Sequence, residues 1–248
     1  SGVEVCFANP GTSEMQLVAA IGNTGSMRPV LCLFGGVASG AADGYGRMAD
    51  KPAITLLHVG SGFANSLANL HNARRAGSPL VNIVGDHASY HLQYDAPLTS
   101  DLPALADWAS AWTHVAESPD DLAAAGAAAV AEAQAGNGRI ATVVVPADHA
   151  WNPAAGAAPV QPVRSAAAVA EETIAKTAER LKSGRQTVLF LGGRALREEN
   201  LYRLGQVAAA TGARLVCQVF PARLQRGAGR VAVERLPYFA EQATEALA

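Results

Sequence analysis

The residues best suited to chemistry lie where apolar runs end. His58 stands at the end of the run Ala53–Val59, and the glycine-rich Gly60-Ser61-Gly62 follows it at once. A histidine in such a place can carry protons, or it can simply hold a structural hydrogen bond. The two glycines let a ligand approach the backbone, or they make an ordinary tight turn. Both pairs of readings stay open at this level.

Several other kinds of site lack their full set of residues. His87 and His91 are four residues apart, but no third spaced ligand accompanies them, so we expect no metal site. Glu14 and Asp43 have no second carboxylate spaced to pair with them, which argues against a two-carboxylate hydrolase. Ser61 is not in a GxSxG turn. The GxGxxG and GxxxxGK[ST] motifs of dinucleotide and P-loop proteins are also missing.

The elements that must position these residues alternate between apolar runs and helix-like segments. This alternation predicts parallel βαβ units in an α/β fold, a flavodoxin-like, doubly wound and mostly parallel sheet. A capping box, Ser13-x-x-Gln16, is expected to start the first helix. The predicted strands are Val3–Phe7, Val30–Phe34, Ala53–Val59, Leu80–Gly85 and Ala141–Val145, and the predicted helices are Ser13–Ile21, Val37–Met48, Phe63–Arg75 and Asp120–Gln134.

Parallel sheets of this kind bind ligands at the carboxyl ends of their strands. In this chain those ends fall at Ala8–Ser13, Phe34–Gly36, His58–Asn65 and Asp86–His91. These segments hold many of the glycines, histidines and asparagines of the first half. The sequence therefore predicts a site along one edge of the sheet.

The second half is organised differently. Residues 1–150 are interpreted as one domain, and the proline-containing stretch 151–165 as a linker. Residues 166–248 repeat a helix–strand pattern with two predicted helices, Ala166–Leu181 and Glu198–Thr211, and only two predicted strands, Thr187–Leu191 and Arg214–Phe220. Because two strands make a poor core, this second α/β domain is expected to be partial. Both ends of the sequence look trimmed.

The composition excludes several classes of protein. Of 248 residues, 50% are hydrophobic and 16% charged, and the formal net charge is −2, so neither nucleic acid nor an acidic membrane is an expected partner. No apolar run is long enough to span a bilayer, and no signal peptide is evident. The three cysteines, which lie in apolar runs, are interpreted as buried free thiols in the cytoplasm.

One predicted helix, Val37–Met48, has an apolar face made of small residues. Small residues let another backbone or helix come close. Tight packing within the chain and a subunit interface explain this composition equally well.

Four strings, in order, carry a family resemblance: Phe7–Glu14 (FANPGTSE), Gly40–Arg47 (GAADGYGR), Leu57–Asn65 (LHVGSGFAN) and Ser78–Asp86 (SPLVNIVGD). Together they resemble the N-terminal pyrimidine-binding domain of thiamine-diphosphate enzymes of the acetolactate synthase and benzoylformate decarboxylase type. The resemblance continues weakly into the central domain of that family. It implies residues 1–150 as pyrimidine-binding domain and 166–248 as the start of the central domain. The C-terminal diphosphate-binding domain, with its GDG…N motif for Mg²⁺, is absent from this sequence.

The resemblance also implies roles for individual residues. It places thiamine diphosphate between two subunits, which makes a homodimer or homotetramer the expected assembly, and it leaves FAD without support. It matches His58 to a histidine used in proton transfer and Thr12 to a position lining the substrate pocket. The implied catalytic residues are thus His58 and Thr12, and the implied cofactor-binding residues are Asn9, Pro10, Gly11, Gly35 and Asn65.

Gly35 departs from the family pattern. It stands where the family has a glutamate that hydrogen-bonds the aminopyrimidine and promotes formation of the reactive ylide. A substitution, a member that works without this carboxylate and a non-catalytic relative all remain open. The resemblance predicts slower ylide formation than in a Gly35→Glu version of the complete protein.

The resemblance implies an acetolactate-synthase-like enzyme that decarboxylates a 2-oxo acid such as pyruvate and then ligates or protonates the carbanion. Alone, this chain is expected to be inactive because it supplies only the pyrimidine half of the site. The alternatives are a non-catalytic binding or regulatory relative and a free-standing nucleotide-binding flavodoxin-like protein.

Overall fold

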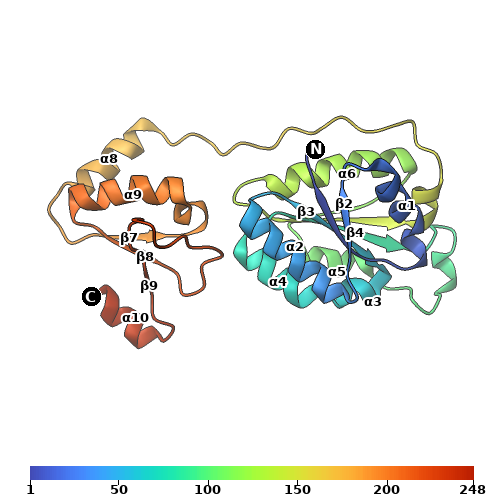
Figure 1. The fold of residues 1–248 in the computed structure, drawn as a ribbon, viewed down its shortest axis with the longest axis horizontal. Helices are drawn as coiled ribbons and strands as arrows, with labels where there is room; N and C mark the ends of the chain where they lie inside the picture. The colour runs from blue at the N-terminus through green and yellow to red at the C-terminus, as the bar shows by residue number, and fades with distance from the viewer. The chain divides into compact units, whose positions relative to one another are not determined.

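A computed structural model describes all residues, 1–248, and divides the chain into two compact units. Unit 1 covers Ser1–Ser165 and unit 2 covers Ala166–Ala248. The stretch 152–170 contains neither helix nor strand. Each unit has its own sheet and its own core (Figure 1).

Unit 1 is built on a six-stranded sheet in which every neighbouring pair is parallel, with strand order β2-β1-β3-β4-β6-β5. The neighbouring interior strands β4 and β6 are mostly apolar and almost wholly buried, as expected for strands covered on both faces. The strands are β1 (Val5–Asn9), β2 (Arg28–Leu31), β3 (Ala53–His58), β4 (Leu80–Asp86), β5 (Trp112–Val115) and β6 (Ile140–Pro146).

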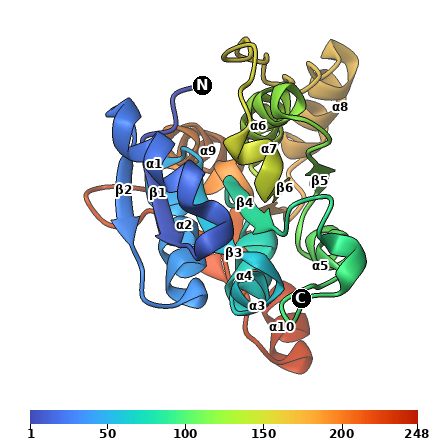
Figure 2. The same cartoon turned by 90° about the vertical axis from the view of Figure 1, so that its right-hand side faces the viewer.

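Helices cover both faces of this sheet (Figures 1 and 2). One face carries α2 (Gly35–Ala49), α3 (Val59–Ala64), α4 (Leu67–Ala76) and α5 (Leu102–Ala109), and the other carries α1 (Met15–Thr24), α6 (Pro119–Gln134) and α7 (Ala147–Trp151). Two short 3-10 turns, η1 (Thr12–Glu14) and η2 (Leu92–Tyr94), complete the unit. This doubly wound arrangement confirms the predicted fold class.

The core is layered accordingly. Under α2, α4 and α5 it contains Leu57, Phe63 and Leu70, all fully buried, while under α6 it contains Val81 and Val143. Apolar burial on this scale is the main stabilising contribution, about 25 cal/mol per Å². None of the helices is long and apolar enough to cross a membrane.

Unit 2 has a parallel sheet in the order β7-β8-β9, where β7 is Val188–Leu191, β8 is Arg214–Cys217 and β9 is Glu234–Arg235. Its helical elements are α8 (Glu171–Leu181), η3 (Gly193–Leu196), α9 (Glu198–Thr211) and α10 (Ala240–Leu247). Leu196, Leu201 and Cys217 lie at the centre of its core. Two of these three strands, β7 and β8, were predicted from the sequence, whereas the two-residue β9 was not.

Several predicted elements differ from the structure. The predicted helix Phe63–Arg75 is divided into α3 and α4, and the predicted strand Val30–Phe34 ends at Leu31. Neither α5 nor β5 was predicted. Edge strand β5 is short and only partly buried, so its sequence WTHV lacks the apolar run of a central strand. The three cysteines are free and buried, as predicted.

Candidate functional site

The carboxyl ends of the strands in unit 1 bring the predicted residues to one edge of the sheet. Figure 2 turns this edge toward the viewer. The turn after β1 holds Asn9 to Glu14, the start of α2 holds Gly35, and the turn from β3 into α3 holds His58. Because all three strands are parallel neighbours, their ends are adjacent.

The turn after β1 is fixed by its own polar groups. The side-chain amide of Asn9 donates to the carbonyl of Cys32 at 3.0 Å, which ties the end of β1 to the residue after β2. Pro10 and Gly11 then lead into η1, where Thr12 is exposed. A Cβ atom at Gly11 would come within 2.5 Å of the His58 ring, so glycine is required for that ring to lie over the turn.

Glu14 is fully buried and pairs with His58. Its Oε2 atom lies 2.9 Å from Nδ1 of His58 and accepts the backbone N–H of Gly11 at 2.7 Å. Burial raises the pKa of the Glu14 carboxyl above its usual value, although the Gly11 N–H and His58 partly oppose this shift. The capping hydrogen bond lies at the start of η1, where the N–H of Gly11 donates to the side chain of Glu14, three residues later. The predicted Ser13-x-x-Gln16 capping box is wrong, because α1 begins only at Met15.

The backbone beside His58 is strained. Val59 has φ of 41° and is fully buried, although left-handed backbone is rare for a β-branched residue. Such conformations cost on the order of 1–3 kcal/mol and persist where the surrounding structure enforces them. The predicted strand Ala53–Val59 accordingly stops at His58, and α3 begins at Val59.

Gly35 lies in the first turn of α2, buried against α3. The hydroxyl of Ser66 donates to the Gly35 carbonyl at 3.0 Å. A Cβ atom at position 35 would lie 2.6 Å from the carbonyl oxygen of Gly62 and 3.4 Å from the Cβ of Asn65. Gly35 and Asn65 are thus neighbours, with Asn65 exposed. At position 35 there is neither a carboxylate nor free space for a side chain.

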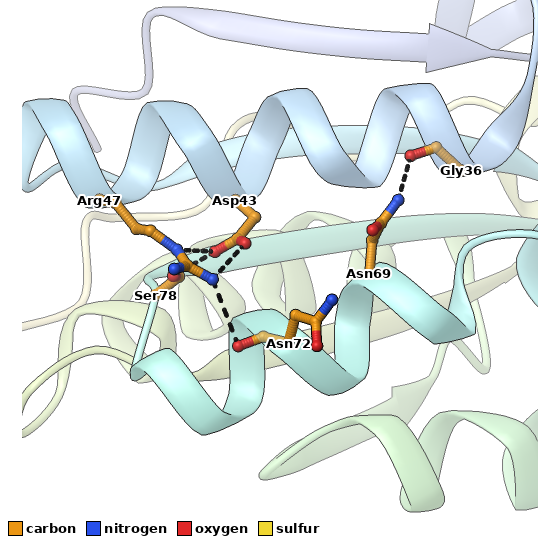
Figure 3. Close-up of polar contacts among 6 residues, drawn as sticks. All are labelled: Gly36, Asp43, Arg47, Asn69, Asn72 and Ser78. Carbon is orange, nitrogen blue, oxygen red and sulfur yellow. Dashed lines mark hydrogen bonds and ion pairs between the residues drawn. The ribbon is translucent and has the colours of Figure 1, made fainter. Parts of the chain in front are cut away.

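Polar contacts between α2 and α4 hold this helix start in place (Figure 3). The Asn69 amide donates to the Gly36 carbonyl at 2.6 Å. Nearer the other end of α2, the guanidinium of Arg47 binds both carboxylate oxygens of buried Asp43, at 2.8 and 2.6 Å. The hydroxyl of Ser78 donates to the same carboxylate. Asp43 therefore has a structural role.

The small residues of α2 pack within the chain. Ala38, Ala42 and Gly46 are buried, and α2 contacts β1, β3 and α4. The opposite side of the helix exposes Val37 and Met48, which are 55% and 67% accessible. Intrachain packing thus explains the small-residue face, and any subunit interface would have to use the exposed side.

The histidines after β4 have no third metal-ligating side chain beside them. The rings of His87 and His91 lie 5.7 Å apart, but no group of three or more histidine, cysteine, aspartate or glutamate side chains is close enough to hold a metal ion. The buried Nε2 of His87 has no hydrogen-bond partner.

The predicted site residues fall into two adjacent groups. The first group lies at the end of β1 beside His58 and consists of Asn9, Pro10, Gly11 and Thr12. The second group is Gly35 and Asn65, which lie next to each other at the start of α2. Helix α3 connects the two groups, since a Cβ atom placed on Gly62 would lie 3.4 Å from the Cβ of His58. Sequence reasoning missed the partnership of Glu14. Its position three residues after Gly11, at the N3 position of a turn, was the signal available.

Comparisons with known proteins agree with this geometry. Residues 1–117 match the family described as "Thiamine pyrophosphate enzyme, N-terminal TPP binding domain". The chain is 50% identical over 246 residues to the "Putative acetolactate synthase large subunit IlvX" of Mycobacterium tuberculosis. This alignment covers 99% of this chain and 47% of that protein. It is 28% identical over 195 residues to the benzoylformate decarboxylase of Pseudomonas aeruginosa, covering 77% of this chain and 37% of that protein.

A solved structure shares the fold of the whole chain. The "putative thiamin diphosphate-dependent enzyme isolated from Mycobacterium smegmatis" superposes with a TM-score of 0.89 at 25% identity, over 99% of this chain and 48% of that one. The chain thus spans less than half the length of each of these relatives. Residues 1–117 therefore match the N-terminal TPP-binding domain of the thiamine pyrophosphate enzymes, and the chain as a whole is similar to proteins of that kind.

Proposed function

We propose that the complete protein decarboxylates a 2-oxo acid such as pyruvate with thiamine diphosphate, and then ligates or protonates the product, as an acetolactate-synthase-like enzyme. The observation that carries this proposal is the hydrogen-bonded pair of Glu14 and His58 beside the Pro10-Gly11 turn, at the carboxyl edge of the sheet. A side chain able to carry a proton thereby lies at the carboxyl edge of the sheet, the edge at which open parallel sheets bind ligands.

The residues of this edge fit the ring end of the cofactor in part. The Gly11 turn and the exposed Asn65 leave backbone and amide groups accessible, and Pro10, Asn9 and Gly35 complete the proposed binding surface. The fit lacks one element, a carboxylate at position 35. When bound, thiamine diphosphate would supply the carbanion chemistry of decarboxylation. Its Mg²⁺ and diphosphate contacts are proposed to come from a domain outside this sequence.

Within this site His58 is proposed to move a proton. Glu14 occupies Nδ1, and the His58 side chain remains 23% exposed, so Nε2 is the nitrogen available to a substrate. Thr12, exposed in the same turn, is proposed to line the substrate pocket. Whether the product is ligated to a second carbonyl compound or protonated depends on the other half of the pocket.

A second subunit is part of the proposal. In a homodimer or homotetramer, the exposed side of α2, with Val37 and Met48, would lie at or near the interface. Burying these side chains would offset the cost of exposing apolar groups to water. We propose a cytoplasmic location because all three cysteines are free.

A non-catalytic binding or regulatory relative is the second candidate. One observation favours it: position 35 has no carboxylate, and a side chain there would meet the Gly62 carbonyl. Such a protein would keep the fold and bind the cofactor or a regulator without turnover.

Calorimetric titration of Mg²⁺–thiamine diphosphate into the complete protein tests the proposal, followed by assays of pyruvate and other 2-oxo acids. We expect saturable binding and CO₂ release that His58→Asn abolishes. The matched control is His71→Asn, at an exposed position on α4. Binding without turnover of any 2-oxo acid would favour the second candidate, and no binding would refute the proposed enzyme and leave only a relative that binds another ligand.

A further inference from the structure

Glu14 is an unusual group for the interior of this fold. It is the one acidic residue with no exposed surface, and its Oε1 atom is buried without any hydrogen-bond partner. Leaving a buried acceptor unpaired destabilises the folded chain, and more so if the group is charged. A residue retained at such a cost calls for an explanation beyond packing.

The surroundings of Glu14 are shaped around its side chain. A Cβ atom at Gly85, near the end of β4, would overlap Oε1, so only glycine leaves room there. On the other side, Gly11 is required for the His58 ring, and its N–H binds Oε2. Two glycines on two different strand ends thus enclose the contact between Glu14 and His58.

We infer that Glu14 is the positioning residue of His58: it holds Nδ1 in a fixed protonation pattern, so that Nε2 faces the site in one tautomer. The catalytic meaning of this inference rests on the function proposed above. The geometric claim stands on the contact itself, in which one carboxylate oxygen meets both Nδ1 and the Gly11 N–H.

The two protonation states of the pair have opposite consequences for Nε2. If Glu14 is ionised, Oε2 accepts Nδ1–H, and Nε2 of a neutral ring is an acceptor, ready to take a proton. If Glu14 is protonated on Oε2, it donates to Nδ1, and Nε2 carries the hydrogen as a donor. Each state orients the ring and specifies one tautomer. The two states differ by one proton: when Nε2 gains a proton, the hydrogen on Nδ1 passes to Oε2 of Glu14, and the reverse steps release the proton from Nε2.

Other charged groups near η1 are bound elsewhere. The elements that contact η1 are β3, β4, α1 and α7, which bring His58, Asp86, Asp148 and His149, while α1 has no titratable side chain. Asp86 accepts the N–H of His87, Asp148 accepts from Ser89, and Nδ1 of His149 contacts the Ala116 carbonyl. His58 is left as the ionisable partner of Glu14.

The tautomer of His58 can be measured directly in the 248-residue chain. Long-range ¹H–¹⁵N spectra of histidine-labelled protein report which ring nitrogen carries the hydrogen, and His58→Asn assigns the signal among the six histidines. We expect a single tautomer in the wild type. In Glu14→Ala we expect the mixed tautomers of a free imidazole. The wild-type pattern persisting in Glu14→Ala would overturn the inference.

Glu14→Gln serves as the variant that keeps the shape. Because the pKa of Glu14 is raised in the folded chain, the folded chain binds more protons than the unfolded chain above pH 4.5. The contribution of Glu14 to the free energy of unfolding therefore falls as the pH rises through that region. Glu14→Gln should remove this fall, while Glu117→Gln, at an exposed position, should keep it. An unchanged pH dependence in Glu14→Gln would contradict the buried position of the Glu14 carboxyl, on which the inference depends.

Activity of the complete enzyme separates this inference from the proposed function. We expect kcat of Glu14→Gln to fall at least tenfold with a displaced pH profile, and KM to change little. The predicted tautomer pattern in a complete protein with no decarboxylase activity would sustain the role of Glu14 and reject the function. Full activity and an unchanged pH profile in Glu14→Gln would reject the role.

Discussion

Substituting Gly35 by alanine tests how tightly the start of α2 is packed on α3. The added Cβ would lie 2.6 Å from the Gly62 carbonyl oxygen and 3.1 Å from Oγ of Ser66. The Gly62 carbonyl is a backbone group, so it cannot move aside as a flexible side chain could. Overpacking of this kind costs about 1–3 kcal/mol. The usual gain from replacing a helical glycine, about 0.5–1 kcal/mol, offsets part of it. We therefore expect Gly35→Ala to destabilise the chain by about 1–2 kcal/mol.

Gly44→Ala is the matched control, since Gly44 lies in the same helix and an added Cβ there meets nothing within 4 Å. We expect it to stabilise the chain by about 0.5–1 kcal/mol. In urea unfolding the two variants should move the midpoint in opposite directions, and in thermal unfolding Gly35→Ala should lower Tm by about 2–8 °C. Equal stability of the two alanine variants would refute the packing argument.

The same close packing affects the substitution of Gly35 by the glutamate that the resemblance implies at this position. A Gly35→Glu variant of the complete protein is predicted to exchange the thiazolium proton faster, and that comparison stays a prediction. The structure adds that such a variant must first displace the Gly62 carbonyl or shift α2. We therefore expect any gain in rate to come with a loss of stability.

Three further predictions concern the rest of the chain. Arg47→Met should lower the free energy of unfolding in urea by about 2–3 kcal/mol, because buried Asp43 loses its bidentate partner. A loss of less than about 0.5 kcal/mol would contradict this. Leu56→Ala, at a position 1% exposed, should cost about 2–5 kcal/mol, whereas Leu31→Ala, 74% exposed, should stay within about 0.5 kcal/mol. Burial raises the pKa of the Cys6 thiol to about 12, so iodoacetamide at pH 8 should leave it unmodified in folded protein, and rapid alkylation there would refute its burial.

The apolar pattern predicted the central part of the fold well. β3, β4 and β6 read as continuous apolar runs because both of their faces are covered, and α9 was predicted with its observed bounds, Glu198–Thr211. The edge strand β5 could not be found in this way. Its residues are half-buried, so packing against β6 rather than an apolar run specifies it.

The site shows a similar division. The positions of His58 and the Pro10-Gly11 turn followed from where the strands end, which the sequence does indicate. The Glu14–His58 contact joins residues 44 apart, and it depends on η1 tightening the turn and on Gly85 leaving space. The left-handed backbone of Val59 was equally hidden, because valine is the wrong residue type to suggest it. Local patterns carry no signal for such tertiary requirements.

The strand order of unit 1 also limits where the chain could be divided. β6 lies between β4 and β5 in the sheet, although it follows both in the sequence. A protein ending at residue 117, where the family match ends, would therefore lack the strand that joins them. The edge of β4 would be open for intermolecular strand pairing, and β5 would have no neighbour. The smallest piece that can complete this sheet and fold cooperatively must extend through Pro146, so the segment recognised by similarity is shorter than the segment that can fold.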